Sequence, residues 1–209
     1  DYGEEIAQDP NFSKFGDELW MLGGGVLFEY DTRDFTANPY SGIYARAGVT
    51  LYRTVEGKSR EPFGQWTLDL RNYQTVFREG SVVAFRLLTG SSLGDVPYNK
   101  MFTLGSSSKL RGYTEGRFRE MTSLQAVAEY RVTFGGEYVA GRSFFNQRPG
   151  LATWVAFGTM GENFLELEGA VPNVGVGFRY EVEERQNIRI DYGIGINESS
   201  LYIIFEEAY

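Results

Sequence analysis

The sequence of 209 residues contains no cysteine and no histidine. Without cysteine there is no disulfide framework, no thiol nucleophile and no thiolate zinc site. Without histidine there is no Ser-His-Asp triad and no histidine metal ligand. Basic residues are fewer than acidic ones, 20 against 28, and the formal charge of -8 argues against a nucleic-acid partner, which requires clustered lysine and arginine. These absences exclude most classes of enzyme, and we expect no catalysis and no cofactor.

Long hydrophobic runs are also absent. No stretch of about 18 apolar residues occurs, so the sequence predicts no transmembrane helix. The chain is instead rich in glycine, with 26 residues, and in aromatic residues, with 14 tyrosines and 16 phenylalanines. This composition is common among outer-membrane β-barrels, and it also fits soluble all-β proteins.

Apolar and polar residues alternate along much of the chain, which predicts β-strands. The alternating segments lie near residues 19–31, 42–53, 64–76, 81–90, 123–134, 151–160, 173–182, 186–196 and 200–209. In the segment 186–196, for example, Ile188, Ile190 and Ile194 share one face, and Arg189 and Asp191 lie on the other. The pattern therefore predicts an all-β, antiparallel fold with one apolar and one polar face.

A soluble β-sandwich and a transmembrane β-barrel both produce such alternation. Three features favour the barrel. The segments approach the length of about 9–11 residues that a tilted membrane strand needs, and aromatic residues lie toward the ends of the apolar face. The chain also stops on an amphipathic segment whose apolar face carries Leu201, Ile203, Phe205 and Tyr209. We predict a transmembrane β-barrel portion over residues 19–209, preceded by an irregular segment at 1–18.

The longest connection between predicted strands spans residues 91–122, far beyond ordinary loop lengths, and is a candidate for function. It contains the run Leu110, Arg111, Gly112 and Tyr113, and the next strand contains Glu129, Tyr130 and Arg131. Together with the turn from Asp31 to Asp34 and the final residues Glu207, Ala208 and Tyr209, these motifs resemble the C-terminal barrel of the BamA/TamA bacterial surface antigen superfamily. The resemblance covers roughly residues 20–209, in the short form that lacks long periplasmic domains.

The resemblance implies that the loop folds back into the barrel lumen, where its arginine binds acidic residues of the inner wall. A guanidinium suits this role because it can bind a carboxylate through two parallel hydrogen bonds. Glu129 lies on the polar face of its strand and matches the superfamily's acidic partner, so the resemblance implies a contact between Arg111 and Glu129. The superfamily usually has a second acid on the following strand, where this sequence has Ala156. Either the anchor is weaker here, or Asp191, Asp69 or Glu181 compensates.

The other charges on the polar face are expected to form a mutually paired network rather than a substrate site. These charges are Arg46, Arg71, Arg86, Arg131, Arg179 and Arg189.

Typical members of the superfamily form sixteen strands, and the predicted strands match only the C-terminal portion of such a barrel. We therefore expect the chain either to be part of a longer barrel or to close with a second chain. The implied location is the bacterial outer membrane, in contact with lipid, lipopolysaccharide and other outer-membrane proteins.

The implied function is assembly or translocation of outer-membrane proteins, in which an incoming strand pairs with an exposed sheet edge and no chemistry occurs. The alternatives are a non-catalytic barrel subunit of a larger outer-membrane complex and the transport barrel of a patatin-like lipase. A soluble β-sandwich binding module is the alternative outside the membrane.

Overall fold

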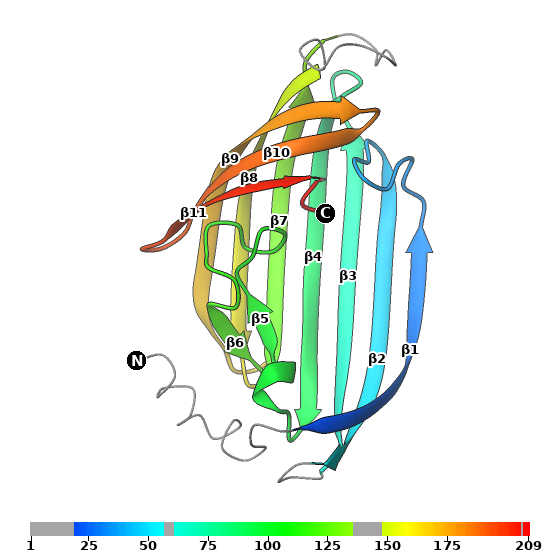
Figure 1. The fold of residues 1–209 in the computed structure, drawn as a ribbon, viewed down its shortest axis with the longest axis vertical. Coiled ribbons are helices and arrows are strands. Elements are labelled where there is room, and N and C mark those ends of the chain that lie inside the picture. The colour runs from blue at the N-terminus through cyan, green and yellow to red at the C-terminus, as the bar shows by residue number, and fades with distance from the viewer. Residues whose placement is uncertain (1–18, 57–60, 136–147, 206) are drawn as a thin grey trace.

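The computed structural model describes residues 19–56, 61–135, 148–205 and 207–209. Its main element is one antiparallel sheet of nine strands (Figure 1). Neighbouring strands follow one another along the chain, in the order β1-β2-β3-β4-β7-β8-β9-β10-β11. Their bounds are β1 Trp20–Asp31, β2 Gly42–Glu56, β3 Phe63–Thr75, β4 Ser81–Gly94, β7 Thr122–Thr133, β8 Arg148–Gly161, β9 Leu167–Glu183, β10 Gln186–Ile194 and β11 Ser199–Phe205. Every segment predicted from alternation overlaps one of these strands, and several strands extend beyond the predicted bounds. The segment 1–18, predicted to be irregular, lies outside the described residues.

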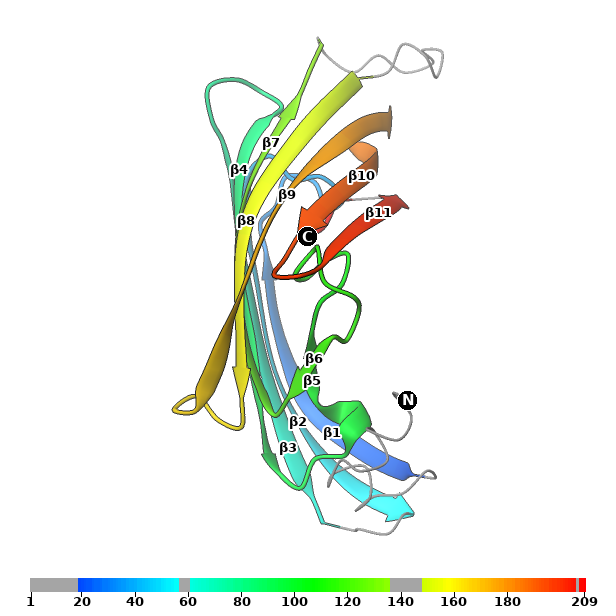
Figure 2. The same cartoon turned by 90° about the vertical axis from the view of Figure 1, so that its left-hand side faces the viewer.

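Between β4 and β7 the chain leaves the sheet and forms the long loop. The loop contains a 3-10 helix, η1 (Tyr98–Lys100), and a small hairpin of β5 (Phe102–Leu104) and β6 (Phe118–Glu120). Figure 2 shows the sheet from the side, curved, with this loop on its concave side. Among the described residues no helix is long and apolar enough to cross a membrane.

The two faces of the sheet differ in chemistry, as the alternation predicts. Large apolar side chains on the convex face stay exposed, including Val26 (79%), Leu51 (68%) and Ile203 (67%). The concave face carries buried charged residues such as Asp69 and Arg179. This arrangement inverts that of an ordinary soluble sheet, in which the apolar face is buried and the charged face is solvated.

A hydrophobic cluster lies between the concave face and the loop. The loop contributes Leu104, Leu110 and Tyr113, which are almost completely buried, and the sheet contributes Val127 and Trp154. The loop therefore packs as an integral part of the interior.

The described sheet is not closed. β1 and β11 are the end strands of the sheet order, and each pairs with one strand only within the described part of the chain. The C-terminal strands lean over the concave face (Figure 2), and Asp34, in the β1–β2 connection, lies 2.5 Å (Oδ2 to Nη1) from Arg185 in the β9–β10 turn. The fold is thus all-β and antiparallel, and the closed barrel remains a prediction.

The prediction for the last strand needs one correction. Leu201, Ile203 and Phe205 lie on the exposed face as expected, but β11 ends at Phe205, and Tyr209 is buried on the concave side instead of sharing their face. The reason lies in Glu207, whose carboxylate accepts a hydrogen bond from Arg179 at 2.9 Å and one from Asn187 at 2.7 Å. A buried carboxylate is stable only when it is paired in this way, so these contacts turn the chain end inward.

Candidate functional site

The tip of the long loop is its most deeply buried part. Leu110, Arg111, Gly112 and Tyr113 are all buried against the concave face. Gly112 has a φ of +125°, a conformation that residues with a side chain rarely adopt. A Cβ atom there would also lie 2.7 Å from the amide nitrogen of Asn173. The glycine therefore allows the chain to turn tightly beside Arg111 while touching the sheet.

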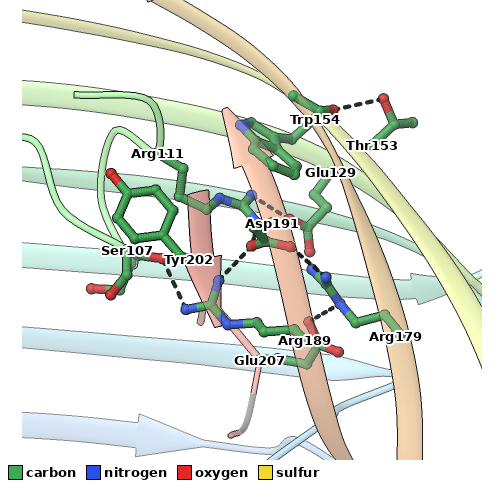
Figure 3. A network of polar contacts seen from close by, with 12 residues as sticks. Ser107, Arg111, Glu129, Thr153, Trp154, Arg179, Arg189, Asp191, Tyr202 and Glu207 are labelled. Atoms are coloured by element: carbon green, nitrogen blue, oxygen red, sulfur yellow. Dashed lines mark hydrogen bonds and ion pairs between the residues drawn. The ribbon is translucent and has the colours of Figure 1, made fainter. Parts of the chain in front are cut away.

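Arg111 is held by two carboxylates and one aromatic ring (Figure 3). Its guanidinium donates hydrogen bonds to Glu129 on β7 and, at 2.9 Å, to Asp191 on β10. Its Cζ atom also lies 3.6 Å from the ring centroid of Trp154 on β8. Burial alone would lower the pKa of Arg111, but the Glu129 and Asp191 carboxylates raise it above its usual value. The guanidinium is thus a permanent cation joining the loop to three strands.

The contact between Arg111 and Glu129 is the one that the sequence predicts. The second acid is Asp191, one of three candidates that the sequence leaves open. The other two bind different arginines, since Asp69 pairs with Arg71 and Arg86 at 2.7 and 2.8 Å, and Glu181 pairs with Arg148. Ala156 is on the concave face, two residues from Trp154.

Asp191 is the centre of a larger buried network (Figure 3). Besides Arg111, it pairs with Arg179 and Arg189, both at 2.5 Å. Arg179 continues to Glu207 at 2.9 Å. The arginines expected on the polar face each have an acidic partner, inside this network or outside it. These arginines are Arg46, Arg71, Arg86, Arg131, Arg179 and Arg189.

Tyr113 fixes the loop tip through its hydroxyl group and its ring. The hydroxyl donates to the carbonyl of Pro172 at 2.7 Å and accepts from the backbone N–H of Ile196 at 2.8 Å. Its ring packs edge-on against Phe118 with the centroids 5.3 Å apart. Leu110, the first residue of the motif, is buried in the hydrophobic cluster. All four residues of the motif therefore contact the interior, each through a different type of interaction.

Sequence reasoning missed two groups of residues at this site. Trp154 occupies a position of the polar face otherwise filled by small residues, with Ala152 and Ala156 on either side in the alternation, and this contrast was the available signal. Gly193 and Gly195 lie directly under the loop tip. Their alternation with apolar residues in the predicted segment 186–196 was visible, but it did not reveal what they face.

The described residues contain no group of three or more acidic side chains placed to hold a metal ion. The site consists instead of paired charges, an aromatic platform and glycines. Such an arrangement can hold a loop in a defined position inside a curved sheet.

Comparison with known protein families gives a match over most of the chain. No curated protein sequence matches the chain. The family model of the Omp85 superfamily domain matches residues 14–200, which include all of the strands from β1 to β10 and the whole loop. This agrees with the resemblance carried by the loop motif and by the last strands. The chain therefore belongs to the Omp85 superfamily.

Proposed function

We propose that the sheet is part of a β-barrel in the bacterial outer membrane, with its concave face toward the lumen and its convex face toward lipid. The superfamily domain supports an outer-membrane location in general. The exposed apolar side chains of the convex face fit contact with lipid, and the charged concave face fits a polar lumen. A closed barrel would also give hydrogen-bond partners to the backbone N–H and C=O groups at the edges of β1 and β11. In the membrane interior these groups would otherwise remain unpaired.

The proposed activity is assembly or translocation of outer-membrane proteins by strand templating. An edge strand presents unpaired backbone N–H and C=O groups that can pair with an incoming strand. The observation that carries the proposal is β11, a strand of seven residues that pairs with β10 alone in the described part of the chain. The process needs positioning and no chemistry, in keeping with a superfamily whose members are generally non-enzymatic.

Site-specific disulfide trapping tests this proposal, and the absence of native cysteine removes background reactions. Single cysteines would replace consecutive residues from Ser199 to Phe205 in the full chain in native membranes. An incoming outer-membrane protein would carry a cysteine in its last strand. We expect adducts at β11 in a register that shifts by one residue when the client cysteine shifts by one. Cysteines at Ala126 and Ala128, on the centrally paired strand β7, are the matched controls. Equal adduct formation at both strands would refute templating.

A second function is favoured by the other open edge. β1 also has a single partner, β2, among the described residues, and a sheet with two open edges has room for further strands on both sides. A non-catalytic subunit of a larger outer-membrane complex, closed by a second chain, would use β1 as a permanent contact. Cysteines in β1 would then trap one partner in the absence of any client. Trapping at β11 that depends on the client supports the templating function instead.

A further inference from the structure

The β10–β11 hairpin contacts the long loop at several points along its length. At β10, Arg189 donates a hydrogen bond to the carbonyl of Ser107 at 2.9 Å. In the turn, Glu198 pairs with Arg117 at 2.7 Å. On β11, the hydroxyl of Tyr202 donates to the carbonyl of Tyr113 at 2.9 Å. These contacts connect the loop to the hairpin that carries the edge strand.

Two glycines of β10 and its following turn permit this close approach. A Cβ atom on Gly193 would lie closer than 3.0 Å to backbone atoms of Arg111 and Gly112, and one on Gly195 would lie equally close to the ring of Tyr113. Neither glycine is among the residues with positive φ, so space and not backbone conformation requires them. We call Gly193 and Gly195 the glycine seat.

The neighbouring strand β9 pairs with β10 through the backbone from Gln186 to Ile194, but it offers the hairpin no side chain at Gly193. Gly193 faces Gly175 of β9 across the sheet, and the space above Gly175 is filled by the ring of Trp154. No side chain of β9 or β10 therefore fills the concave face at this pair. The loop tip occupies that position instead, so it is the loop that packs against the hairpin here.

We propose that the glycine seat makes the position of edge strand β11 depend on the position of the loop tip. When the loop is seated, the hairpin is held over the concave face. When the loop leaves, the hairpin loses these contacts and the edge strand becomes free to move. The inference deepens the proposed function, because it assigns Gly193 and Gly195 as positioning residues for the edge that would pair with an incoming strand.

Spin-label distances in the full chain, reconstituted in lipid vesicles, test the coupling. One pair of engineered cysteines, at Glu115 and Ser199, reports the distance from loop to hairpin, and a second pair, at Val155 and Ser199, reports the distance from sheet to hairpin. These three positions are exposed. In Gly193→Ala and in Gly195→Ala we expect both distance distributions to broaden. The matched control is Gly24→Ala, because a Cβ at this strand glycine meets no atom within 4 Å, and it should leave both distributions unchanged.

The outcomes separate coupling from a merely structural effect. If the loop–hairpin distance broadens while the sheet–hairpin distance stays sharp, the coupling is wrong. If neither distance distribution changes, the assignment of Gly193 and Gly195 as positioning residues is wrong. In a Tyr113→Ala background the effect of Gly195→Ala should disappear, because the ring that the new methyl group meets is gone; an undiminished effect would overturn the assignment.

A more conservative variant keeps the proposal testable if the glycine-to-alanine variants fail to fold. Tyr202→Phe adds no atom and removes two hydrogen bonds to the loop, one donated to the Tyr113 carbonyl and one accepted from the Gly112 N–H. It should therefore broaden both distributions slightly. Sharp distributions in this variant would count against the coupling. These distances are measured without a client, so they can change as expected even if disulfide trapping at β11 fails. That combination would reject templating and retain the coupling.

Discussion

Replacement of Arg111 by alanine is the most direct test of how the loop is held. The side chain of Arg111 is 1% exposed, and those of its partners Glu129 and Asp191 are completely buried. Removing one member of a buried ion pair costs about 3–5 kcal/mol. Here we expect the lower end, about 3 kcal/mol, because both acids keep another arginine. Asp191 retains Arg179 and Arg189, and Glu129 retains Arg131 at 3.5 Å.

Arg111→Lys should lose less stability than Arg111→Ala. A lysine keeps the positive charge, but it cannot bind two carboxylates with a planar group or stack on Trp154, so we expect a loss of about 2 kcal/mol. The matched control is Arg117→Ala on the same loop. Arg117 is also paired with an acid, Glu198, but its side chain is 49% exposed, and such pairs contribute about 0–1 kcal/mol.

The measurement is urea unfolding of the full chain in phospholipid vesicles, followed by tryptophan fluorescence. Trp154 lies under the Arg111 guanidinium, so the native spectrum of Arg111→Ala should also shift. The order of destabilisation should be alanine, then lysine, then the Arg117 control. A loss for Arg111→Ala no larger than that of the control would refute the view that the buried cation holds the loop.

Two further predictions concern the chain end and the β1–β2 connection. Burial, together with the nearby Glu129 carboxylate, raises the pKa of Tyr209 well above its usual value. The folded state therefore favours the neutral phenol, so the stability that Tyr209 contributes is fully present below about pH 10 and falls as the pH rises further. Tyr209→Phe should remove this part of the alkaline loss, measured as the free energy of unfolding from pH 8 to 11. An identical pH dependence of the free energy of unfolding in both proteins would contradict this prediction. Asp34 accepts hydrogen bonds from two backbone N–H groups of its own connection, at 2.9 and 3.1 Å, besides pairing with Arg185. Asp34→Ala should therefore cost about 1–2 kcal/mol and Arg185→Ala about 0–1 kcal/mol in the same unfolding assay; equal losses would show that the ion pair, and not the backbone contacts, matters.

Alternation could predict the large strands because it reports a local property. In β10 the isoleucines and the charged residues occupy opposite faces, and that pattern needs no knowledge of neighbouring strands. The short strands β5 and β6 escaped prediction because three residues are too few to show a period. The inward turn of Tyr209 escaped because it depends on the contacts of Glu207 with distant residues of β9 and β10.

The loop motif predicted one partner of Arg111 and left the other open, for a physical reason. Glu129 lies on the strand directly after the loop, so its face could be read from the sequence. Asp191 lies on β10, 80 residues from Arg111, and its approach depends on how far the sheet curls. Trp154 and the glycine seat depend on register between strands in the same way. The resemblance of the loop motif, together with the alternation of the following strand, therefore predicted the contact between Arg111 and Glu129. Only the structure shows that Trp154 and the glycine seat lie against the same loop tip.

The sharing of acids in this network bears on whether the loop can move. A lone buried ion pair would leave an uncompensated carboxylate whenever its arginine departed. The free-energy cost of that buried charge would keep the loop in place permanently. Asp191 instead has three arginines around it, so the departure of Arg111 leaves its charge compensated. In the proposed barrel, the departing guanidinium would regain water in the polar lumen, which lowers the cost further. The network thus holds the loop firmly while keeping its release possible, as a loop that controls an edge strand requires.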